Sequence, residues 1–172
     1  MLFLFYIYAM IQSEEFIQVK KQIESFDYQV VDFDFDRPWG GFLVIDETQA
    51  QKFANQFFEG ISIDSLKIGG KLSPKILIVK PKARLSWQYH HRRAEIWRVY
   101  QGVVGIIRSD DDNQKPLITL KEGDQVELKQ GERHRLIGQD QLALVAEIWQ
   151  HTDPNNPSNE EDIVRLQDDF GR

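Results

Sequence analysis

The chain has 172 residues and a net charge of −6, with 21 Lys and Arg against 27 Asp and Glu. The length suits one domain, and 41% hydrophobic residues are too many for a disordered chain. An acidic chain without a basic block is a poor candidate for binding nucleic acid or an anionic membrane. The absence of Cys excludes disulfides, thiolate metal sites and a cysteine nucleophile. We therefore expect a cytoplasmic protein whose metal ligands, if any, are His, carboxylate or amide groups.

The first ten residues, MLFLFYIYAM, are apolar. They are too few to span a bilayer, which takes roughly 20 residues, and they lack the basic start of a secretory signal. Two interpretations stay open. The segment is either a buried or frayed extension, or upstream sequence before a true start at Met10.

Two helices are predicted before the middle of the chain. In residues 14–26 apolar side chains recur every three or four positions, and Ser13 is a candidate cap. Residues 46–58 have the same periodicity, and Gly60 is expected to end that helix.

From Lys75 onward short β-rich runs alternate with turn residues. The predicted strands are residues 75–80, 95–100, 103–107, 117–120, 125–128, 134–137 and 142–149. This spacing favours an antiparallel sandwich or barrel. Near the C-terminus, residues 160–169 are compatible with a short helix or a strand.

Four residues in this β-rich part form a candidate metal site. Gln88 and His90 are two apart, so on a strand they face the same side. Glu95 follows after a short turn, and His134 begins a later strand. Two imidazoles, a carboxylate and an amide suit one divalent transition metal, zinc first, with iron, manganese, cobalt or nickel also compatible. The alternative is that these are ordinary core or surface residues.

The intervals between these residues resemble the two cupin motifs. Gln88, His90, Glu95 and Gly102 match the first motif, with Gln in place of its first His. Gly123, Gly131 and His134 match the second motif. The resemblance implies an all-β fold, a double-stranded β-helix or jelly-roll barrel, with an N-terminal helix and a short helical insertion. We expect an N-terminal extension over residues 1–33 and a cupin domain over 34–172, with the insertion at about 48–72.

A closer resemblance is to the cupin domain of type II phosphomannose isomerases. It covers about residues 34–172 and rests on the segments 37–40, 85–97 and 160–172, which read RPWG, LSWQYHHRRAEIW and EEDIVRLQDDFGR. The chain departs from that family at Arg92 and Ile96, where the family usually has His.

The resemblance implies a metal-dependent isomerase that interconverts mannose 6-phosphate and fructose 6-phosphate. Arg165 and Arg172 match family arginines and are candidates for binding a sugar phosphate, although salt bridges to nearby Asp residues are the alternative. These two and Arg93 are also candidate catalytic residues. The general base is not identified, and a metal-bound water or a Lys on a barrel strand is compatible.

Two other functions stay open. A non-catalytic module that binds a metal and a sugar is suggested by the departures at Arg92 and Ile96. A metal-dependent oxygenase is less favoured, because the Gln ligand and the termini are isomerase-like. A homodimer is compatible with the fold.

Three further features have structural interpretations. We expect residues 37–40 to be structural, with Pro and Gly fixing the chain and Trp packing. His91 alternates with His90 and should point away from the barrel interior. The acidic run at residues 110–112 is expected to be a solvated turn and not a calcium site.

Overall fold

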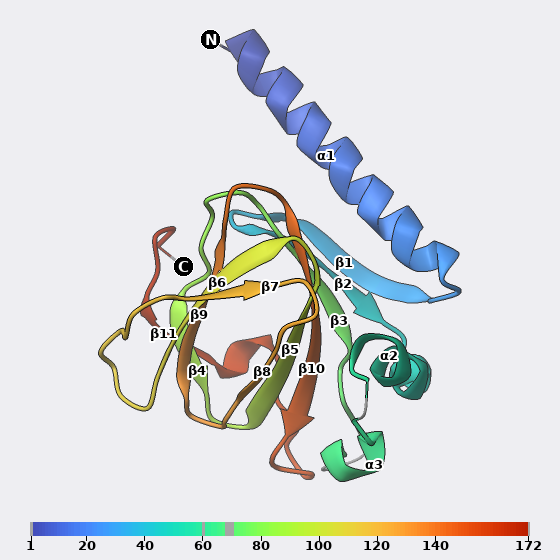
Figure 1. Cartoon of the computed structure of the whole chain (residues 1–172), viewed down its shortest axis with the longest axis vertical. Coiled ribbons are helices and arrows are strands. Elements are labelled where there is room, and N and C mark those ends of the chain that lie inside the picture. Colours follow the sequence, from blue (N-terminus) through green and yellow to red (C-terminus); the bar gives the residue numbers. More distant parts are fainter. Residues whose placement is uncertain (1, 60, 68–70, 172) are drawn as a thin grey trace.

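The computed structural model describes residues 2–59, 61–67 and 71–171. Two antiparallel sheets form a barrel (Figure 1). The six-stranded sheet has the order β1 (Val30–Arg37), β2 (Gly40–Ile45), β3 (Lys75–Val79), β10 (Ala143–His151), β5 (Arg93–Gln101) and β8 (Gln125–Leu128). The five-stranded sheet has the order β11 (Ile163–Gln167), β4 (Trp87–His90), β9 (Arg133–Gly138), β6 (Val103–Ser109) and β7 (Ile118–Lys121). The all-β jelly-roll prediction is confirmed.

One hydrophobic cluster fills the inside of the barrel. It joins alternate residues of both sheets, because successive side chains of a strand face opposite sides. Its members include Leu77, Trp97, Val145, Val104 and Leu136. This packing closes one part of the barrel and leaves the polar residues of β4, β5 and β9 around the remaining space.

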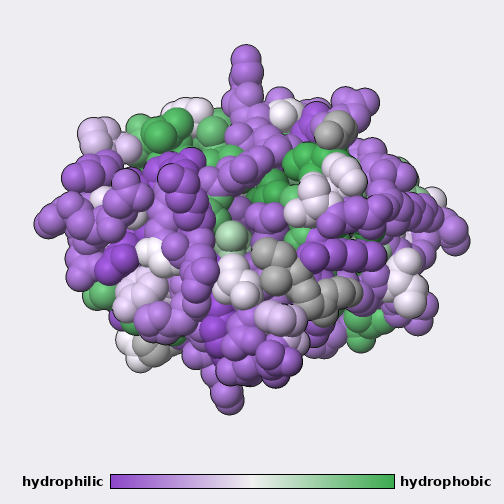
Figure 2. Space-filling view, turned by 90° about the horizontal axis from the view of Figure 1, so that it is seen from below, coloured by the Kyte–Doolittle hydropathy of each residue, from purple (hydrophilic) through white to green (hydrophobic). Residues whose placement is uncertain are grey.

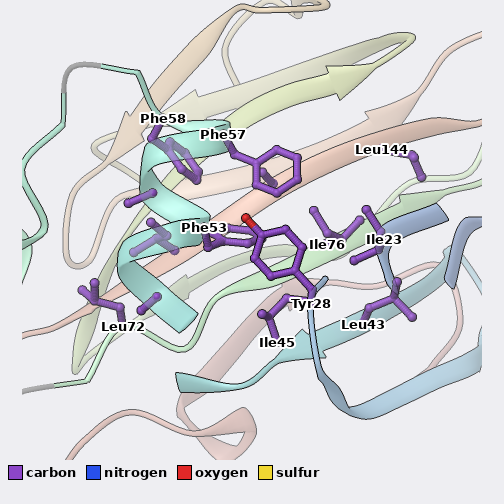
Figure 3. Close-up of a cluster of buried hydrophobic side chains, with 14 of the residues drawn as sticks. Ile23, Tyr28, Leu43, Ile45, Phe53, Phe57, Phe58, Leu72, Ile76 and Leu144 are labelled. Atoms are coloured by element: carbon purple, nitrogen blue, oxygen red, sulfur yellow. The ribbon is translucent and has the colours of Figure 1, made fainter. Parts of the chain in front are cut away.

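A second cluster covers the outer face of the six-stranded sheet (Figure 3). There Phe53 and Phe57 of α2 (Ala50–Phe57) lie over Ile76, while Ile23 of α1 (Leu2–Ser25) lies over Leu43. The helices therefore shield from solvent the face of the sheet that points away from the barrel interior.

The helices differ from the prediction in extent. The helix predicted over residues 14–26 begins much earlier, as part of α1 (Leu2–Ser25). The one predicted over 46–58 is a 3-10 turn at Glu47–Gln49 followed by α2, and Asp46 caps it by accepting a hydrogen bond from Thr48 N at 2.8 Å. Gly60 lies outside the described residues.

The region predicted as an insertion carries most of this second layer. It contains α2 and the short α3 (Ile63–Leu66), whose buried residues belong to the outer cluster. In Figure 1 the N-terminal part of α1 projects past the barrel. Within the described residues, no helix combines the length and apolar character that crossing a membrane requires.

Candidate metal centre

Three buried side chains meet at one end of the barrel interior. His90 ends β4, Glu95 is near the start of β5, and His134 is near the start of β9. Each has a potential ligand atom within 4.8 Å of the others. His90 Nε2 lies 3.1 Å from Glu95 Oε1, and His134 Nε2 lies 3.4 Å from Glu95 Oε2. All three side chains are 2% exposed.

The turn before β9 fixes the orientation of His134. Gly131, at a φ of 76°, allows the turn, and its N–H donates to the His90 carbonyl at 3.0 Å. The Glu132 carbonyl lies 2.9 Å from His134 Nδ1, so it accepts that N–H and leaves Nε2 as the free lone pair. The turn therefore presents His134 Nε2 to the centre of the site.

Arg93 controls the charge of Glu95. Burial opposes ionisation of this carboxyl, but neighbouring His90 and Arg93 hold its pKa well below the usual range. Arg93 Nε donates to Glu95 Oε1 at 2.7 Å. Burial lowers the pKa of His90, which favours the neutral imidazole. An ionised Glu95 and a neutral His90 are the protonation states in which these groups bind metals.

Gln88 lies next to this group. It is the register partner of His134 across β4 and β9, and it is 9% exposed. Ser86 Oγ donates to Gln88 Oε1. The strand pairing thus places the amide of Gln88 beside the two imidazoles and the carboxylate.

One structural observation indicates that these donor atoms are suited to bind a divalent cation. Within the described part of the chain, the buried atoms Glu95 Oε2 and His134 Nε2 have no hydrogen-bond partner. A buried polar atom without a partner costs free energy. A cation bound between these atoms would remove that cost for both.

A cavity of about 60 Å³, partly open to solvent, adjoins the site. Gln88 and Glu95 form part of its wall, so these two candidate ligands face the cavity. The ionisable residues along the wall are Arg37, Lys75, Arg93, Glu95, Glu147, Glu160 and Arg165. Figure 2 shows a mostly hydrophilic surface on the face seen from below, with hydrophobic residues in separate patches.

The arginines predicted to bind substrate or take part in catalysis lie in different places. Arg165 is the register partner of Gln88 across β4 and β11, and it lines the cavity. Arg172 lies outside the described residues. Arg93 lines the cavity and also donates to Ser158 Oγ at 2.8 Å, which ties the site to the C-terminal segment. That segment, whose sequence is compatible with either a helix or a strand, is a short 3-10 turn followed by β11.

The two departures from the isomerase family lie away from the cavity. Arg92 hydrogen-bonds to the Asp162 carboxylate and to Asn156 and Asn159, where it secures the C-terminal segment. Ile96 is 1% exposed and belongs to the outer cluster under the helices. Neither residue lines the cavity. Ile96 does not line it because it faces the side of β5 opposite to Glu95.

Most residues of the cavity wall, among them Arg37, Trp39, Lys75 and Glu147, were not among the predicted site residues. Arg37 and Trp39 were predicted to be structural, yet both line the cavity. The structural expectation for Gly40 fits its backbone: its φ is 150°, and a Cβ there would lie 1.8 Å from the Ile78 carbonyl oxygen. Lys75 and Glu147 are buried on the inner face of the six-stranded sheet. A Lys on a barrel strand was predicted in general terms as a candidate base. Glu147 lies in an apolar run of the sequence, and no motif there marked it as a site residue.

Two other expectations concern surface residues. His91 is exposed, as the alternation with His90 predicts. The acidic run at 110–112 is exposed in the loop after β6, where Asp111 accepts hydrogen bonds from Asn113 N and Ser109 Oγ. This is a hydrogen-bonded turn.

Comparison with known proteins adds a family match and three curated relatives. Residues 59–168 match the family model for the mannose-6-phosphate isomerase C-terminal region. The xanthan biosynthesis protein XanB of Xanthomonas campestris pv. campestris is 34% identical over 110 residues, which are 63% of this chain and 22% of that protein. The alginate biosynthesis protein AlgA of Pseudomonas aeruginosa is 34% identical over 112 residues, 64% and 21% of the two chains. AlgA of Pseudomonas putida is 31% identical over 126 residues, 73% and 24%. This chain spans about a quarter or less of the length of these relatives.

Solved structures support the fold. Oxalate decarboxylase from Bacillus subtilis matches with a TM-score of 0.51 at 15% identity, covering 74% of this chain and 28% of that chain. A mutant of the same enzyme matches with a TM-score of 0.55 at 12% identity, covering 78% and 30%. At these identities the likeness concerns the fold alone.

Proposed function

Since this chain belongs to the mannose-6-phosphate isomerase C-terminal family, we propose that it is a metal-dependent aldose–ketose isomerase acting on a phosphorylated sugar, of the mannose 6-phosphate to fructose 6-phosphate type. The observation that carries the proposal is the cavity next to the donor set. It brings potential metal ligands together with four cationic side chains and three carboxyl groups in one space.

Gln88, His90, Glu95 and His134 are the residues that would hold the metal, and we propose zinc first among divalent ions. When bound, such an ion acts as a Lewis acid that stabilises negative charge on the sugar oxygens as the C2 proton leaves. Arg93 keeps the Glu95 carboxylate ionised, and the Glu132 carbonyl keeps the His134 imidazole in the tautomer that can bind.

The cations on the cavity wall suit a substrate that carries a phosphate. Arg37, Lys75, Arg93 and Arg165 all line it, although the whole chain is acidic. A pocket can be locally basic on an acidic protein. Arg165 is the proposed phosphate ligand, because guanidinium groups bind phosphate oxygens in pairs and because strand pairing sets it beside Gln88. Arg172 stays a proposal from the sequence.

A binding module without turnover is the second candidate. It was suggested by Arg92 and Ile96, but both lie outside the cavity, so they do not alter the surface that a substrate meets. The exchange test below separates binding from turnover. An oxygenase has no support of this kind, because the oxalate decarboxylase likeness concerns the fold alone.

The test is proton exchange at C2. The purified chain, supplied with one divalent metal at a time, is incubated with mannose 6-phosphate in deuterated water, and proton magnetic resonance follows the C2 signal and the appearance of fructose 6-phosphate. The proposal expects metal-dependent deuterium incorporation and ketose formation. Saturable binding of the sugar without exchange would replace the isomerase with the binding module.

A further inference from the structure

Glu147 is a buried carboxyl group on the cavity wall that the metal site does not use. It lies on β10 and is 5% exposed. Its Oε1 accepts a hydrogen bond from Trp97 Nε1 at 3.0 Å. The inner face of the six-stranded sheet thus carries a carboxyl group where its neighbours along β10 are apolar.

Within the described ranges of the chain, packing gives this carboxyl group no ion pair, although the charges of Lys75 and Arg93 act on it from a distance. Among the residues that the structure describes, no Lys, Arg or His nitrogen lies within 4.0 Å of it. The nearby cations are engaged elsewhere: Lys75 Nζ pairs with Glu160 at 2.7 Å, and Arg93 Nε pairs with Glu95 at 2.7 Å. Burying a carboxyl group without an ion pair costs stability, and a Gln or Leu of similar size would avoid that cost.

The position of Glu147 is set by the same strands that set the metal ligands. Across the sheet it is paired with Lys75 of β3 and with Trp97 of β5. Trp97 lies two residues after Glu95, and its ring contacts that of His134 edge-on, with 5.3 Å between centroids. One indole therefore contacts both the Glu147 carboxyl group and a candidate metal ligand.

We propose that Glu147 is the catalytic residue that carries the proton between C2 and C1 of the sugar, an inference that rests on the proposed isomerase function. Its carboxylate takes the C2 proton, and the electrons of the C–H bond form the C1–C2 double bond while the carbonyl electrons move to O1. The carboxylic acid then returns the proton to C1 as the O2–H bond breaks and C2 becomes the carbonyl. The hydroxyl protons exchange with water, so the atoms and charges balance.

Two properties support this role. Burial, with the nearby Glu95 charge, raises the pKa of Glu147 to about 7, so both protonation states are populated near neutral pH. A group with such a pKa can both remove and return a proton. Trp97 Nε1–H donates to Oε1 and so fixes the carboxyl group in one orientation toward the cavity.

The experiment compares Glu147→Gln, Glu147→Ala and a control, Glu127→Gln, in the full chain loaded with metal. Glu127 is an exposed glutamate on β8 of the same sheet. The readouts are deuterium exchange at C2 of mannose 6-phosphate, metal content, substrate affinity by calorimetry, and rescue by added formate. We expect Glu147→Gln to lose about 10²–10⁴-fold in exchange rate, with unchanged metal content and affinity. Formate should restore part of the exchange in Glu147→Ala, since the vacated space admits a small carboxylate.

The outcomes separate the two proposals. If the wild type exchanges C2 and Glu147→Gln keeps its rate within a few-fold, Glu147 is not the proton carrier while the isomerase stands. Glu147 is likewise excluded as the proton carrier if Glu147→Gln loses metal and Glu147→Ala is not rescued by formate, because the residue is then structural. If the metallated wild type exchanges no proton from any phosphorylated aldose offered, both the function and this inference are overturned.

Discussion

At the scale of single residues, a substitution of Arg165 tests whether the cavity binds the phosphate of the substrate. A phosphate ligand used equally in the ground and transition states affects mainly KM. Loss of a hydrogen-bonded charge pair costs about 1.5–3 kcal/mol, or roughly 10- to 100-fold. Arg165→Ala should therefore raise KM for the sugar phosphate by about that factor and change kcat little in steady-state kinetics.

Arg98 provides the matched control for this prediction. It lies on the outward side of β5, half-buried and away from the metal cavity, so Arg98→Ala should leave KM unchanged. A fall in kcat at unchanged KM in Arg165→Ala would contradict a phosphate role and would point instead to a part in the chemical step.

The candidate ligands could be found from the sequence because strand alternation and turn spacing are local. Gln88 and His90 face one side for that reason, and His91 faces the other. Glu147 could not be found in this way. It stands in the run Leu142-Ala-Leu-Val-Ala-Glu-Ile-Trp149, and only the pairing of β10 with β3 and β5 shows that its side chain faces the cavity.

At the scale of elements, α1 divides into two parts with different expected roles. Ile23 is fully buried against the six-stranded sheet, and Ile17 is 42% exposed. Figure 1 shows the N-terminal part projecting past the barrel. Ile23→Ala should cost roughly 2–5 kcal/mol of unfolding free energy. Deleting residues 1–9, or the control Ile17→Ala, should change it by less than about 1 kcal/mol in thermal or denaturant unfolding.

The opposite ranking would contradict this division. A deletion that lowers the unfolding free energy as much as Ile23→Ala would show that residues 1–9 are packed in the native protein. The interpretation of Met10 as the true start would then lose its physical support.

Element boundaries were predicted with uneven success for physical reasons. The amphipathic period of α2 identified it, since Ala50, Phe53, Ala54 and Phe57 are all buried. The first ten residues of the chain are almost uniformly apolar, so they have no polar face from which a helix could be predicted. The segment 160–169 satisfied both helix and strand patterns, and pairing with β4 makes Ile163–Gln167 the strand β11.

At the scale of the whole molecule, the two faces of the six-stranded sheet have different roles. The outer face of the six-stranded sheet packs against the helices and stabilises the fold, while the inner face carries Glu95, Glu147 and Lys75 into the cavity. The two cupin-like motifs allowed the barrel to be predicted. The helical layer that residues 50–57 and 63–66 form over the outer face could not be placed, because its contacts join residues far apart in the chain.

The measurement that tests the central claim most directly is the metal content of the purified chain. Elemental analysis of protein prepared without chelator should find close to one divalent transition metal per chain in the wild type and in His91→Ala, whose side chain is exposed. His134→Ala, which removes a buried donor nitrogen, should retain less than about a tenth of it, since a site with a missing ligand binds far more weakly. Equal metal content in the wild type and His134→Ala, or none in either, would contradict a metal centre at His90, Glu95 and His134.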